Sequence, residues 1–293
     1  MGVGAGMKLA GSRCLITGCS SGIGRALALS LAAQGAWVVA TARRVDTIRD
    51  LGTKGIETFP LDVTEPAQVS RAVAYASPID ILVNNAGYGL EGAIEEVGDE
   101  ELLLQYQTNL FGPWRLCRAV LPEMRARRRG AIVNISSVGG QVPFPGLGAY
   151  RSTKFALEAL SWTLHLEVSH FGIRVLDVQP GLVASDFSTR SLRRATAATA
   201  DSAYAAMRAA AAVVYPRMSP DSEALTPAEV ASAVTGELAR ASGPLRLRVG
   251  DDARRVLAEA QAGEEQYERF LVDELGFTWH PAAIDSQPSR DCP

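Results

Sequence analysis

The chain has 293 residues, of which 47% are apolar and 21% charged, and its formal net charge is −3. That length and composition suffice for a globular domain with a full hydrophobic core, and the balanced charge excludes a general attraction to nucleic acid or to an anionic membrane. No uncharged apolar run approaches the length of a membrane span. The first seven residues lack the apolar core of a signal peptide, so a cytoplasmic location is expected. Four cysteines without metal-ligand spacing (Cys14, Cys19, Cys117, Cys292) indicate reduced thiols and no metal site.

Apolar, β-rich runs alternate with helical patterns through the first 250 residues. The predicted strands are 13–17, 37–41, 56–60, 79–83, 131–135, 174–178 and 245–249, and the predicted helices lie near 22–34, 66–77, 99–127, 149–170 and 227–241. Unbroken apolar runs suit strands that are covered on both faces, and the alternation implies right-handed crossovers. The sequence therefore predicts an α/β fold, a Rossmann-type doubly wound parallel sheet of about seven strands, in one domain over residues 1–280.

The first predicted strand runs into a glycine-rich turn, Thr-Gly-Cys-Ser-Ser-Gly-Ile-Gly at residues 17–24, and then into a helix. Backbone N–H groups and the dipole at a helix N-terminus attract a diphosphate, and glycines let the backbone approach it closely. A nucleotide cofactor is therefore the first functional hypothesis. Its candidate contacts in the turn are Gly18, Ser20, Ser21, Gly22, Ile23 and Gly24.

Tyr150 and Lys154 are four residues apart and share one face of a predicted helix. An ammonium beside a phenol favours the phenolate and is expected to lower the pKa of Tyr150 from about 10. A tyrosine tuned in this way can exchange a proton with an alcohol or an alkoxide. Ser137 precedes Tyr150 by thirteen residues and closes the fifth predicted strand; its neighbour Ser136 is expected to point elsewhere.

Further motifs follow in order: Asn84-Asn85-Ala86-Gly87 after the fourth strand, Asn109 in the next helix and Pro180-Gly181 after the sixth strand. With the glycine turn and Tyr150/Lys154, this set resembles the classical short-chain dehydrogenases/reductases over residues 10–250. The resemblance implies Tyr150 as acid/base, Lys154 also holding the nicotinamide ribose, Ser137 orienting the substrate oxygen and Asn109 supporting a water relay. Alternatively, Asn109 only pins two elements together. Implied cofactor contacts are Asp62, Val63, Asn85, Ala86, Gly87, Pro180, Gly181, Val183 and Ser185, the last replacing a threonine of the family.

The end of the second strand indicates which nicotinamide cofactor fits. An NAD-selective chain carries an acid there to bind the ribose 2′-hydroxyl, whereas this chain has Ala42, followed by Arg43. The loss of a carboxylate and the gain of a guanidinium both favour a 2′-phosphate, to which Ser21 could add a hydroxyl bond. The predicted cofactor is therefore NADP(H). The alternative is that Arg43 and Arg44 are merely solvated.

The sequence around Ser137 and Tyr150 looks like the branch that contains 17β-hydroxysteroid and retinol dehydrogenases. Val142, Phe144 and Phe187 are the candidate substrate contacts, in keeping with a lipophilic ketone, aldehyde or alcohol. Pro143 and Pro145 alternatively do no more than stiffen a loop. Residues 182–226, which are poor in strand signals, are interpreted as a mobile covering segment whose Ala-rich part from Ala195 to Val214 forms an amphipathic helix over a cavity.

Three functions are carried forward. The first is an NADP(H)-dependent oxidoreductase, the second a hydride-recycling epimerase, and the third a non-catalytic NADP(H) sensor. Sensors often lose the tyrosine or lysine, and this chain retains both. The resemblance implies a homodimer or homotetramer through the helices near 99–127 and 149–170. The extension after Gly250 is expected to cover either a neighbouring subunit or the chain's own pocket, and residues 281–293 are expected to be disordered.

Overall fold

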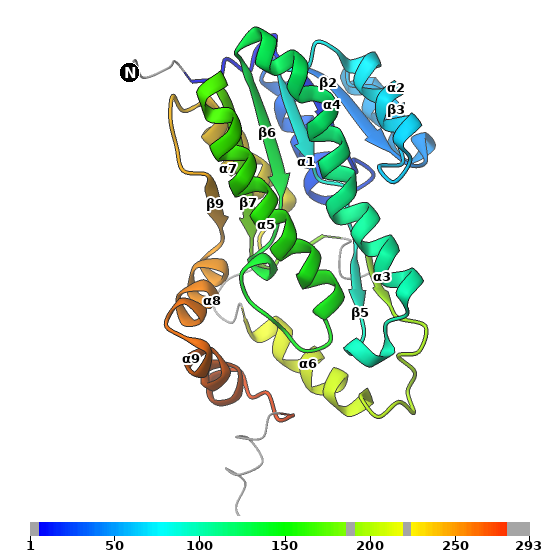
Figure 1. Ribbon diagram of the computed structural model, residues 1–293, viewed down its shortest axis with the longest axis vertical. Helices are drawn as coiled ribbons and strands as arrows, with labels where there is room; N and C mark the ends of the chain where they lie inside the picture. Colours follow the sequence, from blue (N-terminus) through cyan, green and yellow to red (C-terminus); the bar gives the residue numbers. More distant parts are fainter. Residues whose placement is uncertain (1–5, 186–190, 219–223, 280–293) are drawn as a thin grey trace, which may run out of the picture.

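The computed structural model describes residues 6–185, 191–218 and 224–279. Its centre is a sheet of seven parallel strands in the order β3-β2-β1-β4-β6-β7-β9 (Figure 1), which confirms the predicted fold class. The strands are β1 (Arg13–Ile16), β2 (Trp37–Ala42), β3 (Glu57–Pro60), β4 (Ile81–Asn84), β6 (Gly130–Ile135), β7 (Ile173–Pro180) and β9 (Arg246–Val249). Each begins or ends within three residues of its predicted limits.

Helices cover both faces of the sheet, which explains why the central strands are apolar without alternation. One face buries α1 (Gly22–Ala33), the 3₁₀ segment η1 (Val45–Lys54) and α7 (Pro227–Ala239) in a shared apolar core. The other face buries α2 (Pro66–Ala76), α4 (Gly112–Arg127) and α5 (Gly148–Val168). Strand order reverses between β1 and β4, so this fold is expected to bind its ligand beyond the carboxyl ends of those two strands.

The predicted helix 99–127 is divided in the structure. It consists of α3 (Asp99–Tyr106), a π-helical turn η3 (Gln107–Phe111) and α4. A wider turn of this kind re-aims the side chains it carries, and Asn109 lies on it. Single-turn 3₁₀ segments occur at η2 (Ile94–Glu96), η4 (Val138–Gly140) and η5 (Ser169–Phe171).

A two-stranded parallel ribbon was not predicted. It joins β5 (Gly89–Glu91) to β8 (Leu192–Arg194), which lies inside the segment expected to lack strands. Three residues, two of them arginine, carry too weak a pattern for prediction. Of the Ala-rich stretch from Ala195 to Val214, which was expected to be one helix, only the second half is helical, in α6 (Ala205–Arg217); residues 195–204 form turns and bends.

The C-terminal extension folds back onto its own chain through α8 (Asp251–Gln261), α9 (Glu264–Arg269) and the π-helical turn η7 (Phe270–Glu274). Phe270, Leu275 and Phe277 are buried in one apolar cluster with Val142 and Phe144. Of the two interpretations of the extension, the structure supports contact with the chain's own substrate-side loop. Residues 281–293 lie outside the described part of the chain.

Three of the cysteines, Cys14, Cys19 and Cys117, are buried thiols, and burial raises the pKa of each to about 12. Cys292 lies outside the described residues. Across the described ranges, no helix is both long and apolar enough to cross a bilayer. Within the same ranges, no cluster of three His, Cys, Asp or Glu side chains is arranged to hold a metal ion.

Candidate active site

A pocket of about 330 Å³ opens at the carboxyl ends of the central strands and brings the separate motifs together. Among the residues predicted to bind cofactor, its lining includes Gly18, Ser20, Ser21, Gly22, Ile23, Arg43, Asp62, Val63, Asn85, Ala86, Gly87, Tyr150, Lys154, Pro180, Gly181, Val183 and Ser185. Ser137 also lines the pocket. Gly24 and Asn109 do not line it. They contact two residues that do, Asn85 and Tyr88 respectively.

The glycine turn presents open backbone to this pocket. Gly18 and Gly22 have φ angles of +72° and +58°, which only glycine adopts without strain. Ser21 is the N-cap of α1, yet its side chain makes no capping hydrogen bond. The first N–H groups of α1 are therefore not capped by that side chain, which is the arrangement that binds an anionic group.

Asn85 fixes the turn from the neighbouring strand. Its Nδ2 donates to the carbonyl oxygens of Thr17 at 2.9 Å and Gly18 at 3.0 Å. A Cβ on Gly24 would lie 2.3 Å from that same Nδ2, so no larger residue fits at this position without displacing the amide. The Asn-Asn-Ala-Gly motif thus holds the glycine turn in shape.

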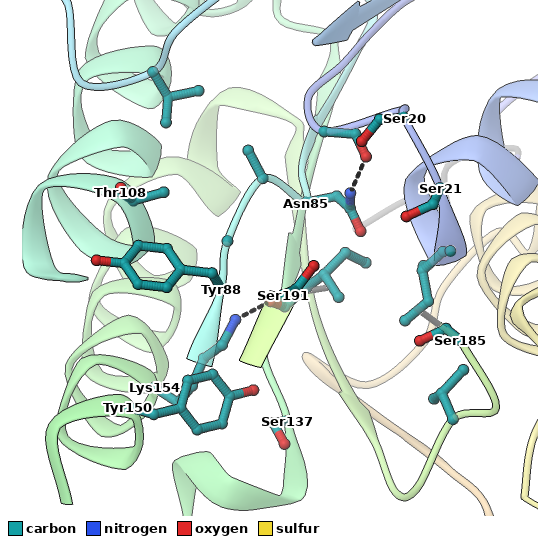
Figure 2. A pocket seen from close by; sticks show the side chains of 18 of the residues that line it. Ser20, Ser21, Asn85, Tyr88, Thr108, Ser137, Tyr150, Lys154, Ser185 and Ser191 are labelled. Atoms are coloured by element: carbon teal, nitrogen blue, oxygen red, sulfur yellow. Dashed lines mark hydrogen bonds between the residues drawn. The ribbon is translucent and has the colours of Figure 1, made fainter. Parts of the chain in front are cut away.

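Ser137, Tyr150 and Lys154 converge on one side of the pocket (Figure 2). The Ser137 hydroxyl is hydrogen-bonded to the Tyr150 phenol and accepts from the Gly139 N–H at 3.0 Å. The Lys154 Nζ donates to the Ile135 carbonyl at 2.7 Å and lies 5.8 Å from the Tyr150 ring centroid. Ser136 is buried and also lines the pocket, so its expected orientation away from this group stays a prediction.

The expected lowering of the Tyr150 pKa is wrong for this structure. Burial raises the pKa of Tyr150 well above its usual value, and the nearby Tyr215 adds to the increase, whereas the Ser137 hydrogen bond lowers it. Burial also lowers the pKa of Lys154 to about 8. The expectation rested on the charge of Lys154 alone. For two side chains this deeply buried, desolvation has the larger effect on the pKa of each.

Two buried carboxyl groups lie beneath Lys154. Asp177 on β7 and Glu158 on α5 are hydrogen-bonded to each other, and their charges raise the pKa of Lys154 against the larger effect of burial. Glu158 also accepts from the Gln179 amide at 2.8 Å and from Arg246 at 3.1 Å. Burial and the adjacent Glu158 raise the pKa of Asp177 to about 9, so the pair shares one proton at neutral pH.

The isosteric Asp177→Asn variant is expected to be more stable than the natural protein at neutral and mildly alkaline pH. The pKa of Asp177 is about 9 when folded and near 3.8 when unfolded, so folding takes up a proton between these values. The Asp177 carboxyl therefore contributes a loss of stability as pH rises through this window, up to about pH 8, above which the lowered pKa of Lys154 contributes in the opposite direction; the amide removes the Asp177 contribution. Urea unfolding across the window measures it. A variant less stable than the natural protein on the alkaline side contradicts a shared proton.

Asn109 is buried on the π-helical turn, and its side chain is fully engaged. Its Oδ1 accepts from the Tyr88 N–H at 3.1 Å, and its Nδ2 donates to the Tyr88 carbonyl at 2.9 Å and to the Thr153 hydroxyl at 3.2 Å. The side chain thus ties the strand-end loop to α5, as the alternative interpretation described. The water relay implied by the family resemblance stays a prediction.

Arg43 and Arg44 are both exposed, but only Arg43 lines the pocket. Arg44 turns to Asp46, with 2.8 Å between the guanidinium and the carboxylate. The Asp62 Oδ1 accepts from the N–H and the hydroxyl of Thr64, which fixes this carboxylate at the pocket edge.

Known proteins resemble the chain over most of its length. A family model for short chain dehydrogenase matches residues 12–196. A 3-ketodihydrosphingosine reductase from Bacteroides thetaiotaomicron is 36% identical over 253 residues, covering 85% of this chain and 91% of the relative. The chain belongs to the short-chain dehydrogenase family.

Solved structures agree with this family membership. A short-chain dehydrogenase from Streptomyces avermitilis is 36% identical, with a TM-score of 0.79 over 92% of this chain and 98% of that one. A 3-ketoacyl-(acyl-carrier-protein) reductase from Brucella melitensis, solved with NADH, is 25% identical, with a TM-score of 0.73 over 84% of this chain and 99% of that one.

The substrate side of this short-chain dehydrogenase differs from the prediction. Val142 and Phe144 do not line the pocket but are buried behind it, because α6 and the C-terminal extension supply their apolar partners. Tyr267 donates to the Pro143 carbonyl at 2.8 Å and anchors that loop. Phe187 lies outside the described residues. The lining that sequence reasoning missed includes Tyr88, Leu104, Thr108, Ser191, Arg193 and Tyr215.

Proposed function

We propose that this short-chain dehydrogenase transfers hydride between NADP(H) and a lipophilic ketone, aldehyde or alcohol, with Tyr150 as the general acid/base. The observation that carries the proposal is the convergence of Ser137, Tyr150 and Lys154 on the pocket that the glycine turn also lines. A dinucleotide-binding turn and a proton-transfer group within one cavity are what hydride-transfer chemistry requires of a protein.

The residues present fit a nicotinamide dinucleotide. The N-terminus of α1 and the positive-φ glycines form a cradle for the diphosphate. Six further lining residues complete the proposed site: Asp62 and Val63 for the adenine, and Pro180, Gly181, Val183 and Ser185 for the nicotinamide. The NADH in the related Brucella melitensis reductase supports a nicotinamide cofactor. When bound, the cofactor supplies or accepts the hydride.

The phosphorylated form is favoured by the end of β2. Ala42 offers no carboxylate to a ribose 2′-hydroxyl, and Arg43 reaches the pocket edge without an ion-pair partner among the described residues. A guanidinium in that position suits a 2′-phosphate, which it can bind through two parallel N–H bonds.

The protein's own residues control the proton. In reduction, the neutral Tyr150 phenol donates its proton to the developing alkoxide, and Ser137 holds the substrate oxygen beside that phenol. When Tyr150 gives up its proton it becomes a phenolate, and the Lys154 ammonium, 5.8 Å from the ring centroid, offsets that negative charge. In this proposal Lys154 also binds the ribose. Burial raises the pKa of Tyr150 further above its usual value, so the phenol is protonated at neutral pH and can act as the acid in reduction.

The proposed substrate class rests on the pocket lining and on the relative from Bacteroides thetaiotaomicron. Leu104, Leu182 and Tyr215 provide apolar and aromatic surface in the pocket that Tyr150 lines, and Tyr215 lies close to Tyr150. The Bacteroides thetaiotaomicron relative is a reductase of 3-ketodihydrosphingosine, a ketone with a long hydrocarbon chain. Both observations support a lipophilic carbonyl compound over a small polar one.

A turnover assay separates this function from its alternatives. The purified protein is expected to oxidise NADPH steadily with members of a panel of long-chain aliphatic, steroid and retinoid carbonyl compounds. Tight NADPH binding without turnover across the panel would favour the sensor. Substrate inversion without net NADPH oxidation would favour the epimerase. The complete set of Ser137, Tyr150 and Lys154 supports turnover.

We further propose that a second copy of the chain covers the outer surface of α4 and α5. Trp114, Phe155, Trp162 and Leu166 on these helices are between 43% and 69% exposed. Large apolar side chains gathered on adjacent helices are typical of an interface and costly in water. Members of this family commonly form dimers or tetramers through the corresponding long helices. We therefore propose a second copy of this chain as the partner.

Replacing both Trp114 and Leu166 by Asp is therefore expected to shift the protein to monomers in sedimentation velocity, because two charges cannot be buried unpaired in an interface. Leu29→Asp is the matched control, since Leu29 is 39% exposed on α1, a different helix. A natural protein that sediments as a monomer at micromolar concentration would contradict the proposal.

A further inference from the structure

Two pairs of adjacent arginines flank the pocket in the same way. Arg43 and Arg193 line it, whereas their neighbours Arg44 and Arg194 do not. Arg44 pairs with Asp46 at 2.8 Å, and Arg194 pairs with Glu91 at 3.2 Å. Among the described residues, neither Arg43 nor Arg193 has an ion-pair partner. Of these four guanidiniums, the two that lack a carboxylate partner among the described residues are therefore the two that line the pocket.

The backbone of β8 explains why Arg193 reaches the pocket. This strand pairs in parallel with β5, with Leu90 opposite Arg193, and successive side chains of a strand point to opposite faces. Arg194 therefore turns to Glu91, and Arg193 turns to the pocket side. Ser191, just before β8, lines the same pocket (Figure 2).

Tyr88 holds the Arg193 guanidinium in place. The Arg193 Cζ lies 4.7 Å from the centroid of the Tyr88 ring. The Tyr88 backbone is fixed in turn by Asn109 and by the Gln105 amide, which donates to its carbonyl at 2.8 Å. A cation stacked on a fixed aromatic ring loses less freedom when it binds an anion, so the position is prepared for a ligand.

Both guanidiniums act on the part of the pocket around Tyr88. Burial raises the pKa of the Tyr88 hydroxyl, the charges of Arg193 and Arg43 lower it, and the charge of Glu101 raises it. Two acids lie nearby, but both are already bonded. Asp62 accepts from Thr64, and Glu101 accepts from the Thr196 N–H and hydroxyl.

We propose that Arg193 binds a phosphate group of the dinucleotide and so makes β8 part of the cofactor site. The inference rests on the proposed NADP(H) site and adds to it a cation from the segment that crosses the pocket. The phosphate is either the ribose 2′-phosphate, shared with Arg43, or the diphosphate beside the glycine turn. Cofactor binding would then hold the β5–β8 ribbon in place over the pocket.

The test is equilibrium binding of NADPH and NADH, followed by the fluorescence of the reduced nicotinamide. Arg193→Met removes the charge but keeps an apolar stem against Tyr88, and Arg194→Met is the matched control on the same strand. We expect Arg193→Met to raise the Kd for NADPH about tenfold or more, with the control unchanged. A loss confined to NADPH identifies the 2′-phosphate, and an equal loss for NADH identifies the diphosphate.

Two results would overturn the inference while leaving the cofactor site standing. One is unchanged binding of both cofactors by Arg193→Met, and the other is an equal loss in both methionine variants. Failure of the natural protein to bind either dinucleotide would instead overturn the proposed function, and the inference with it. Thermal unfolding without cofactor checks that the variants fold alike.

Discussion

Tyr150→Phe is expected to lower the rate of NADPH-dependent carbonyl reduction by about 10²–10⁴-fold while leaving NADPH binding within about twofold of the natural protein. The substitution removes only the phenolic oxygen, which is hydrogen-bonded to Ser137, and keeps the buried ring. Without that oxygen, the developing alkoxide has no proton donor from the protein at this position. The measurement pairs steady-state NADPH oxidation with a fluorescence titration of the cofactor.

Ser137→Ala is the companion variant, because it removes the hydroxyl that bonds to Tyr150 and leaves the phenol itself. We expect a smaller loss of turnover than in Tyr150→Phe, again with cofactor binding preserved. A Tyr150→Phe enzyme that keeps more than a tenth of the natural rate would show that the proton comes from elsewhere.

Arg43→Ala is expected to weaken NADPH binding by about 10–100-fold and NADH binding by less than about threefold. A charge-assisted hydrogen bond contributes roughly 1.5–3 kcal/mol, and the guanidinium can make two of them to a phosphate. Only the phosphorylated cofactor carries that group on its ribose, so only its affinity depends on Arg43. The dissociation constants of both cofactors, measured in one buffer, decide the point.

Arg44→Ala provides the control, because Arg44 is paired with Asp46 and does not line the pocket. Its affinity for both cofactors is expected to match that of the natural protein. Equal losses for NADPH and NADH in Arg43→Ala would refute the 2′-phosphate role and restore the view of Arg43 as a solvated side chain.

Local signals predicted the fold and the cofactor half of the pocket. The central strands of the main sheet are apolar runs bounded by turns, and the glycine turn, the Asn85 loop and the Pro180-Gly181 end each follow such a run. In a parallel sheet the carboxyl ends meet at one edge, so the order along the chain was enough to bring these residues together.

The substrate half could not be predicted because its contacts are non-local. Whether Val142 faces the pocket depends on Phe270 and Tyr267, more than a hundred residues away, which bury its side of the loop. The inward turn of Arg193 depends on the pairing of a three-residue strand with β5. The raised pKa of Tyr150 likewise follows from burial, which the spacing to Lys154 does not reveal.

The most direct measurement is a crystal structure of the protein with NADP⁺ bound. The account predicts the diphosphate on the N-terminus of α1, the 2′-phosphate against Arg43 and the nicotinamide ring beside Tyr150, with Lys154 on its ribose. A dinucleotide bound away from the glycine turn, or a nicotinamide ring out of reach of the Tyr150 hydroxyl, would contradict it.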